Sequence, residues 1–244
     1  MIIKKPAADE IPLLQSLWQE AFGDPPEFIE SFFQNGYSPE RCLVLYVEQT
    51  PAAALYWFDC LWEGEKCAYV YGVATAQQYQ GKGLCKALMT QLHQTLCKQD
   101  YAGAVLVPAK EDLFTLYKKL GYTPFCPTEK QTILPDGTVS VVKTSGLCNV
   151  PAGAVTHTRE ALQFLESYCH FYTGDGFCFW GTVENGTLYI QEFSGDSSLL
   201  PAICGAIGAE KTICRVYGSG KDYAMFLPLC DPDFYPRYFG IPLD

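Results

Sequence analysis

The segment Tyr69–Leu88, with the sequence YVYGVATAQQYQGKGLCKAL, has the residue types and spacing of a phosphate-binding loop. An apolar run leads into Gln78-x-x-Gly81-x-Gly83, and a helical pattern begins directly afterwards. Glycines at these positions allow positive φ angles and let a ligand approach the backbone closely. Because the free N–H groups and dipole of a helix N-terminus attract anions, the segment predicts a phosphate or pyrophosphate site. Taken alone, the pattern is equally typical of an ordinary strand-to-helix turn.

Three common nucleotide loops do not fit this segment. The dinucleotide fingerprint G-x-G-x-x-G needs a third glycine where this chain has Lys86. A Walker loop needs lysine directly after its second glycine, but Leu84 follows Gly83. A kinase loop is covered by a hairpin strand and is not followed by a helix. The pattern therefore excludes NAD and ATP loops of these kinds.

The elements around the loop are predicted from hydrophobic periodicity and turn residues. Strand patterns cover residues 2–6, 42–48, 53–62, 66–74, 104–107, 123–134 and 138–144, and helical patterns cover 9–22, 28–33, 84–97 and 113–120. Short turns separate the three strands before the loop, which predicts an antiparallel meander running into it.

Together with a second motif, the loop resembles that of the GNAT acetyltransferase superfamily. Gln78, Gly81 and Gly83 match the acetyl-CoA loop of this family, which has the form Q/R-x-x-G-x-G/A after the fourth strand. A second family element, L-Y-x-K-L-G-F/Y, is matched by Leu116–Tyr122 with the sequence LYKKLGY. Since the two motifs occur in the family's order within residues 2–144, the chain is identified as a member of this superfamily.

The resemblance implies a mixed α+β fold, in which a central, mostly antiparallel sheet is flanked by helices and its fourth and fifth strands splay apart. Acetyl-CoA is then the cosubstrate. Its pantetheine arm lies in the gap between these strands, and backbone N–H groups from about residue 80 to residue 85 hold its pyrophosphate. The cofactor-binding residues implied in this way are Val73, Thr75, Gln78, Gln80, Gly81, Lys82, Gly83, Leu84 and Cys85.

Tyr117 is the general acid that the resemblance implies. In matching GNAT enzymes, the tyrosine at this position protonates the thiolate of CoA as the tetrahedral intermediate collapses. A phenol with a pKa of about 10 is a suitable proton donor at neutral pH. The alternative is that Tyr117 is an ordinary residue of an amphipathic helix, packed beside Leu113, Leu116 and Leu120.

The general base is left open by the sequence. Many GNAT enzymes have a glutamate on the fourth strand, whereas this strand offers Cys67, Tyr69 and Tyr71. We expect Tyr71 to assist a direct attack, in which the ammonium group loses its proton through ordered water. The other candidates are Asp59, the hairpin acids Glu63 and Glu65, and the carboxylate of Asp244, because the C-terminal carboxylate can act as the base in Eis-type tandem GNAT enzymes. The chain also departs from the family in having Lys110 where many members have a cofactor-contacting asparagine.

A second, smaller part is expected after a GNAT domain of residues 1–144. Residues 145–155, SGLCNVPAGAV, carry no charge and have the composition of a linker. Residues 156–244 show a helical pattern, a hairpin with the turn Asn185-Gly186, a second helical pattern and further strand patterns. The predicted elements cover residues 159–171, 177–184, 187–193, 198–207, 212–217 and 223–229. This order echoes the first part without a Gly-rich loop, so we expect a degenerate GNAT-like domain.

Composition limits the possible partners. The chain has 17 Lys and Arg residues against 27 Asp and Glu residues, and its net charge of −10 argues against nucleic acid or an anionic membrane. No apolar run reaches the length of a membrane span, and the N-terminus lacks the apolar core of a signal peptide, which predicts a cytoplasmic location. The 12 cysteines form no C-x-x-C pair and the 3 histidines have no ligand spacing, so no metal site is expected.

We therefore expect an acetyl-CoA-dependent N-acetyltransferase that moves an acetyl group to a primary amine of a small, cationic acceptor and acts as a monomer or homodimer. Attack on a thioester requires a neutral amine held near the carbonyl, so such an enzyme works mainly by positioning. One alternative is a non-catalytic acyl-CoA-binding regulatory module, which the missing strand carboxylate favours. Another is transfer to an oxygen or of a longer acyl chain.

Overall fold

The computed structural model describes residues 1–233, 235–240 and 243, which fall into two compact units. The first unit comprises Met1–Pro124, Thr156–Phe164 and Ala224–Pro236, and the second comprises Phe125–Val155, Leu165–Tyr223 and Arg237–Asp244. Neither unit is one continuous stretch of chain. The functional division into residues 1–144 and 156–244 stays a prediction.

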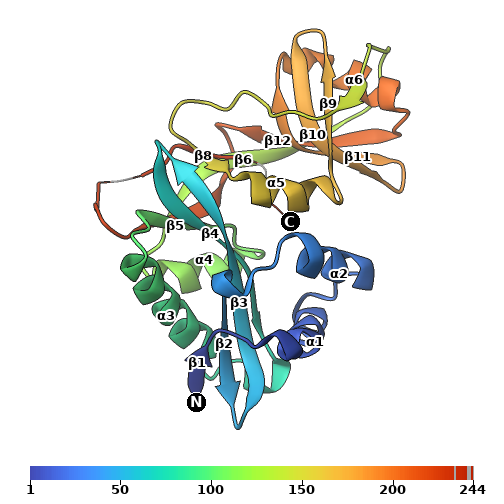
Figure 1. The fold of residues 1–244 in the computed structure, drawn as a ribbon. Coiled ribbons are helices and arrows are strands. Elements are labelled where there is room, and N and C mark those ends of the chain that lie inside the picture. The colour runs from blue at the N-terminus through green and yellow to red at the C-terminus, as the bar shows by residue number, and fades with distance from the viewer. Residues whose placement is uncertain (234, 241–242, 244) are drawn as a thin grey trace. The chain divides into compact units, whose positions relative to one another are not determined.

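The sheet of the first unit has the strand order β1-β2-β3-β4-β5-β13 (Figure 1). Its strands are β1 (Ile2–Lys4), β2 (Cys42–Val47), β3 (Thr50–Trp62), β4 (Glu65–Thr75), β5 (Gly103–Leu106) and the end of β13 (Lys221–Pro228). All neighbours are antiparallel except β4 and β5, which are parallel. A parallel pair needs a crossover connection, and the helix α3 (Leu84–Lys98) supplies it. The sheet thus matches the mostly antiparallel arrangement expected from the sequence.

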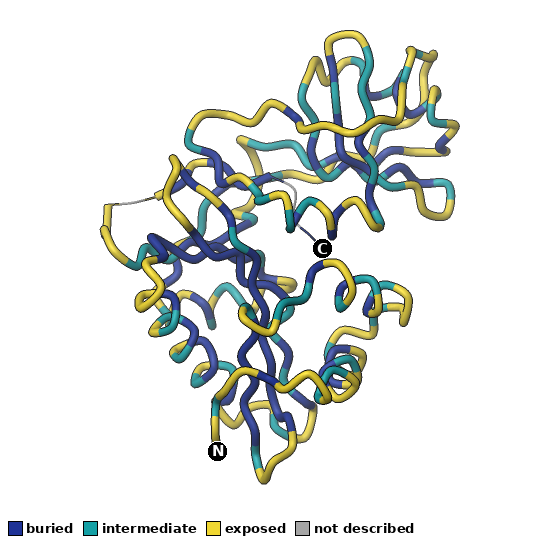
Figure 2. Tube along the Cα trace, viewed as in Figure 1, coloured by how far each residue is buried: buried dark blue, intermediate teal, exposed yellow. Residues whose placement is uncertain are grey.

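Helices cover both faces of this sheet. On one face lie α1 (Ile11–Phe22) and α2 (Pro26–Asn35), and on the other lie α3 and α4 (Glu111–Lys118) (Figure 1). Short 3₁₀ turns precede three of the elements: η1 (Ala8–Glu10), η2 (Pro39–Arg41) and η3 (Gln77–Tyr79). Because both faces are covered, β2, β3 and β4 are buried along most of their length, as Figure 2 shows.

The second unit repeats part of this plan. Its strands are β6 (Thr123–Ile133), β7 (Val142–Thr144), β9 (His170–Gly174), β10 (Phe177–Glu184), β11 (Thr187–Ser194) and β12 (Lys211–Tyr217), in the order β6-β12-β11-β10-β9-β7. The hairpin β10–β11 is antiparallel, η4 (Ser197–Leu199) and α6 (Leu200–Ile207) follow, and β12 returns parallel to β11. The same succession of hairpin, helix and parallel strand forms β3, β4, α3 and β5. Apart from this sheet, β14 (Tyr238–Phe239) pairs with the first residues of β8 (Ala154–His157).

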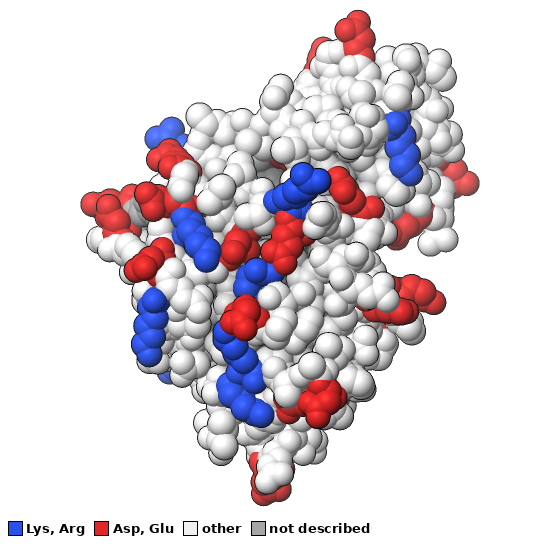
Figure 3. Space-filling model, in the orientation of Figure 1, with Lys and Arg blue, Asp and Glu red and all other residues white. Residues whose placement is uncertain are grey.

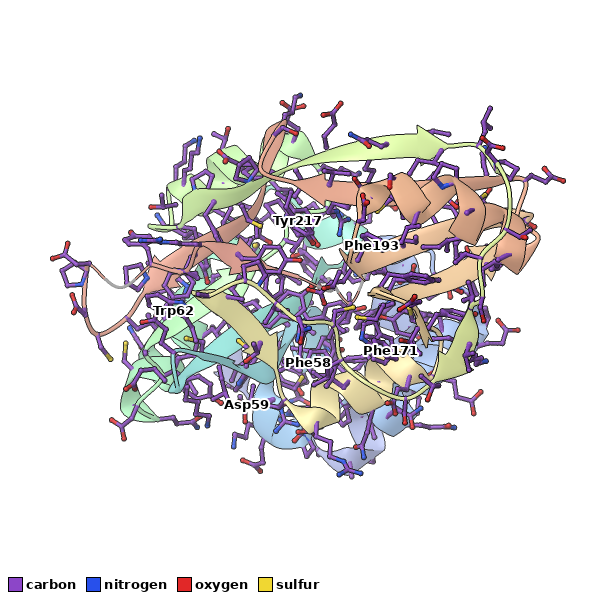
Figure 4. All side chains as sticks on the ribbon, turned by 90° about the horizontal axis from the view of Figure 1, so that it is seen from above. Phe58, Asp59, Trp62, Phe171, Phe193 and Tyr217 are labelled. Atoms are coloured by element: carbon purple, nitrogen blue, oxygen red, sulfur yellow. The ribbon has the colours of Figure 1, made fainter. Side chains whose placement is uncertain are left out.

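The turn at Asn185-Gly186 is confirmed, since both residues have positive φ angles, 48° and 74°. The helix predicted over residues 159–171 is wrong at its end. Helix α5 (Arg159–Glu166) stops earlier, and β9 begins at His170. The reason is the aromatic run that follows, because Phe171 of β9, labelled in Figure 4, pairs with Trp180 of β10 with ring centroids 5.4 Å apart. The strand predicted at residues 138–144 is reduced to β7.

Candidate active site

The site begins where β4 and β5 separate. The two strands pair only over Cys67–Tyr69 and Gly103–Val105, although β4 continues to Thr75. Residues 70–75 therefore have no partner on β5, and backbone groups on that edge are left available. This is the splay that the resemblance implies.

A bulge in β4 lies at the start of the separated part. Tyr71 is opposite Tyr56 and Ala74 is opposite Ala54, so β4 has one more residue than β3 between these pairs. Gly72 has a φ of 59°, and a Cβ atom there would lie 2.7 Å from the ring of Trp18. Glycine is thus required at this position both by the backbone angle and by the packing of α1.

The loop between β4 and α3 presents backbone donors. Gly81 and Gly83 have φ angles of 73° and 79°, and a Cβ atom on either would meet no atom within 4 Å. Among the residues that the structure describes, none accepts a hydrogen bond from the N–H groups of residues 81–86. These groups lie at the positive end of the α3 dipole, so the loop can bind a phosphate or pyrophosphate.

Three contacts hold this loop in place. The N–H of Gln77 donates to the Glu20 carboxylate of α1 at 2.6 Å, and the Gln80 side chain donates to the Thr75 carbonyl at 3.3 Å. The N–H of Gln80 donates to the Gln77 carbonyl, so the row of free donors begins at Gly81 rather than at Gln80. The loop is therefore anchored on α1 and on the end of β4.

The nine expected cofactor residues lie along this strand end and loop, with different exposure. Val73 and Thr75 are half-buried on the separated part of β4, while Gln78, Gln80, Gly81, Lys82 and Gly83 are exposed. The ammonium group of Lys82 lies 5.2 Å from the ring centroid of Tyr79. Leu84 is buried in the core, so only its backbone is available, and Cys85 is half-buried in the first turn of α3.

Tyr117 comes from α4 and packs on the same side of the sheet as α3. It is buried, with its ring 5.9 Å from that of Tyr122 in an edge-on arrangement. Burial raises the pKa of its phenol above the usual 10, and the nearby Cys85 thiol adds to the effect. The Tyr117 hydroxyl makes no hydrogen bond to any described residue and is not enclosed.

Tyr71 faces the opposite side of the sheet. Its ring lies 5.7 Å from Trp18, 5.6 Å from Phe32 and 5.6 Å from Phe58, within an aromatic cluster formed by β3, β4, α1, α2 and α5. The structure thus places Tyr71 and Tyr117 on opposite faces of the sheet, near the splay. It does not bring the two side chains into contact.

The acids considered as bases lie elsewhere. Asp59, labelled in Figure 4, accepts a hydrogen bond from Tyr101 and lies 3.8 Å from Lys66 and 4.0 Å from Arg41. It is opposite Ala68, about 10 Å along the strands from Tyr71. Glu63 and Glu65 are exposed at the hairpin end remote from the splay, and Asp244 is outside the described residues.

One candidate base near this face was missed by sequence reasoning. His157 of β8 lies beside Tyr69 of β4, with ring centroids 5.8 Å apart, and Tyr69 in turn lies 5.9 Å from Tyr71. The chain brings His157 to β4 only after passing through the second unit. No local pattern around residue 157 signals that return.

Metal ligands, membrane-spanning helices and basic surfaces would each indicate a different kind of site. Among the described residues, no three His, Cys, Asp or Glu side chains are grouped as metal ligands. None of the described helices combines the length and apolar character needed to cross a membrane. On the face drawn in Figure 3, Lys and Arg side chains lie among Asp and Glu side chains.

Comparisons with known proteins agree with this geometry. Splayed parallel strands beside a Gly-rich loop define the class as the GNAT fold. The sequence model described as "Acetyltransferase (GNAT) domain" matches residues 3–125, about half of the chain. The protein therefore belongs to the GNAT acetyltransferase family.

Similar solved structures share the fold of the whole chain. They include a GCN5-related N-acetyltransferase from Anabaena variabilis, with a TM-score of 0.67 and 18% identity, covering 94% of this chain and 73% of that chain. A putative acetyltransferase from Pyrococcus horikoshii gives 0.62 and 18%, with 98% and 94% covered. Eis1 from Mycobacterium abscessus gives 0.63 and 11%, with 94% and 74% covered. No curated protein sequence gives a significant match.

Proposed function

We propose that the protein is an acetyl-CoA-dependent N-acetyltransferase acting on a primary amine of a small, cationic acceptor. The observation that carries this proposal is the combination at the splay of β4 and β5. The free N–H groups of residues 81–86 lie at one end of it, and Tyr117 is close enough to Cys85 of α3 to be influenced by its thiol. In this proposal, phosphate-binding and proton-donating groups flank one gap between strands.

In this proposal the cofactor is held mainly by backbone. The pyrophosphate accepts hydrogen bonds from the N–H groups of residues 81–86, and the pantetheine arm pairs with Val73 and Thr75 on the free edge of β4. Gln78, Gln80 and Lys82 border the loop, with Lys82 adding positive charge. Backbone contacts depend on geometry rather than on side chains, which explains how they persist at low sequence identity.

The proposed reaction gives Tyr117 one step. A neutral amine attacks the thioester carbonyl, a C–N bond forms, and the tetrahedral intermediate collapses by breaking the C–S bond. Tyr117 then donates its phenolic proton to the departing thiolate, and the extra proton that the nitrogen loses as the amide forms restores the phenol. The raised pKa of Tyr117 supports this role, because it keeps the phenol protonated at neutral pH.

The acceptor is proposed to approach over the face of Tyr71. The segment of residues 6–39, which includes α1 and α2, contains no Lys or Arg but has six acids. Asp24 is fixed there by a hydrogen bond of 2.8 Å from the Trp18 indole. Acidic helices over a cluster of aromatic rings suit a cationic amine, which both carboxylates and ring faces attract.

Removal of the ammonium proton is assigned to ordered water assisted by Tyr71. His157 is a second candidate, favoured by its place beside Tyr69 on the same face. General-base catalysis contributes about 10²–10⁴-fold, so the two can be separated by variants. His157→Asn should lower kcat/KM if the imidazole is the base, and should leave it unchanged if water is.

A non-catalytic acyl-CoA-binding module is the second candidate function. It is favoured by one observation, that the separated part of β4, residues 70–75, has no carboxylate or histidine of its own. Such a module would bind acetyl-CoA without ever transferring the acetyl group.

The location is proposed from the cysteines. The described cysteines are free, including Cys60 and Cys67, which face each other on β3 and β4. Unlinked thiols at paired positions suit the reducing cytoplasm. A monomer or homodimer is proposed there.

The test is release of free CoA from acetyl-CoA, followed with a thiol reagent across a panel of amines. We expect turnover with polyamines, amino sugars or lysine derivatives, and much weaker turnover with neutral amines of similar size. Tight acetyl-CoA binding without turnover on any amine would establish the non-catalytic alternative.

A further inference from the structure

The second unit contains a splay of its own. Strands β11 and β12 pair in parallel only over Thr187–Ile190 and Lys211–Cys214, although they continue to Ser194 and Tyr217. A bulge lies at the same point, because Gly181 is opposite Ile190 while Trp180 is opposite Glu192. Bulge and splay thus recur in the position that they have in β4 and β5.

A pocket of about 240 Å³ opens at this second splay. Its lining residues come from three neighbouring strands: Lys130 of β6, Tyr189, Ile190 and Gln191 of β11, and Ile213 and Arg215 of β12. All six belong to the second unit. The volume equals that of about eight liquid water molecules, which is enough for a small organic molecule.

The polar groups of this pocket are cationic or can donate hydrogen bonds. Lys130 and Arg215 are direct partners across β6 and β12, so their side chains lie on one face of the sheet. Like charges directly opposite each other on neighbouring strands repel, and a bound anion would relieve that repulsion. No carboxylate is among the lining residues, and Lys130 forms no ion pair with any described residue.

Arg215 is held in a defined position. Its guanidinium group donates to the Tyr223 hydroxyl at 2.9 Å and lies 4.0 Å from the centroid of that ring. A fixed guanidinium beside a flexible ammonium, with an amide and a phenol nearby, can bind a carboxylate or phosphate group. The side chain of Ile213 supplies an apolar wall for the rest of the ligand, while the Ile190 side chain lies in the core on the other face of the sheet.

The loop of this second splay does not suit CoA. Between β11 and α6 the chain has Gly195-Asp196-Ser197, and the Asp196 carboxylate accepts a hydrogen bond of 2.9 Å from the N–H of Ser198. This carboxylate occupies a donor at the start of the helical segment and repels a pyrophosphate. The pair of open glycines at Gly81 and Gly83 has no counterpart there.

We infer that the pocket at the β11–β12 splay binds a small organic anion through Lys130 and Arg215, separately from the CoA site. The shared chemistry is a carboxylate or phosphate group on a body of a few carbon atoms. This inference does not depend on acetyl transfer by the first unit.

The test titrates the full chain with succinate and, separately, with inorganic phosphate by calorimetry, with chloride at matched ionic strength as the blank. We expect at least one of the two anions to bind. Lys130→Gln should weaken that binding about tenfold or more, and Arg215→Gln at least as much. The control is Lys211→Gln, which removes the same charge from an exposed position of β12 outside the pocket and should change the affinity less than twofold.

The anion that binds identifies the chemical class of the ligand. Binding of succinate alone indicates carboxylates, and binding of phosphate alone indicates phosphoesters. Cooperative thermal unfolding of each variant establishes that it is folded. Because Lys130 is exposed to solvent, Lys130→Gln should not affect folding. Absence of binding to either anion overturns the inference, as does equal binding in Lys130→Gln and the intact chain. A second equivalent of CoA that competes with succinate would overturn the separation from the CoA site.

Discussion

Among single residues, the proposed mechanism depends most on Tyr117. Sequence alone left two interpretations of this residue, a general acid or a helix residue packed among leucines. The structure gives it features of both, because the ring is buried beside Tyr122 while the hydroxyl is neither enclosed nor hydrogen-bonded to a described residue. A buried phenol with a free hydroxyl is what proton donation to a bound thiolate requires.

Replacing Tyr117 with Phe tests this role. The change removes the proton donor and keeps the ring, so we expect kcat to fall by about 10²–10⁴-fold while acetyl-CoA binds with nearly unchanged affinity. Steady-state kinetics and calorimetry measure the two quantities. The matched control is Tyr122→Phe, since the Tyr122 hydroxyl bonds to His93 at 3.1 Å rather than facing the site. Equal activity of Tyr117→Phe and Tyr122→Phe would remove Tyr117 from the mechanism.

At the scale of elements, the strand β4 and the loop after it carry the site. Their existence was predictable, because the apolar run and the glycine spacing are local signals in the sequence. The splay was not locally visible and entered only through the family resemblance, and the bulge at Gly72 was not predicted at all. The short β9 was missed because aromatic residues fit both a helix face and a strand, and cross-strand pairing with β10 decided the outcome.

Contacts between segments that are far apart in the chain could not be predicted from the sequence either. Arg41 of η2 contacts Glu160 of α5 and lies near Asp59 of β3, and His157 reaches Tyr69. The partners are 119 residues apart in the first of these pairs. Such pairs are defined only in the folded chain. For this reason the sequence left Asp59 as a candidate base, whereas the structure places it in an ion-pair network.

The role of a loop glycine in CoA binding can be tested against a glycine elsewhere with a similar φ angle. Gly83→Ala places a Cβ atom in open space at a φ of 79°, where an L-residue is strained by about 1–2 kcal/mol. We expect a similar loss of stability for Gly208→Ala, whose φ is 73° and whose Cβ site is also open. Only Gly83→Ala should weaken CoA binding, by about tenfold or more, because its methyl group enters the phosphate site. Equal affinities for CoA in the two variants would place the phosphates elsewhere.

The bulge glycine makes a different prediction. Gly72→Ala adds a methyl group 2.7 Å from the Trp18 ring, so overpacking adds to backbone strain. We expect the free energy of unfolding to fall by about 2–4 kcal/mol in denaturant titrations. Gly64→Ala, at a φ of 87° in the hairpin turn with nothing within 4 Å, should lose only about 1–2 kcal/mol. Equal losses would show that α1 does not pack on the bulge as described.

At the scale of the whole molecule, stability should depend on pH through a buried carboxyl group. Glu192 is 2% exposed, its carboxylate accepts a hydrogen bond of 3.0 Å from Tyr238, and burial raises its pKa from 4.5 to about 7. A raised pKa means that the folded state binds the proton more tightly than the unfolded state. The stabilisation is therefore complete below about pH 4.5 and is lost as the pH rises through 7.

Glu192→Gln isolates this effect, because glutamine does not titrate. Between pH 5 and pH 8 we expect the unfolding free energy of the intact chain to fall by about 2–3 kcal/mol relative to the variant. Denaturant titrations at the two pH values measure the difference. Parallel pH profiles for the two proteins would show that Glu192 titrates normally in the folded state.

We propose that acetyl-CoA lies in the gap between β4 and β5 of the first unit, with its sulfur at Tyr117. The most direct measurement is a crystal structure of the protein with acetyl-CoA. We expect pyrophosphate oxygens about 3 Å from backbone nitrogens of residues 81–86, and the thioester sulfur within about 3.5–4 Å of the Tyr117 hydroxyl. A pyrophosphate bound away from this loop, or a sulfur out of reach of Tyr117, would contradict it.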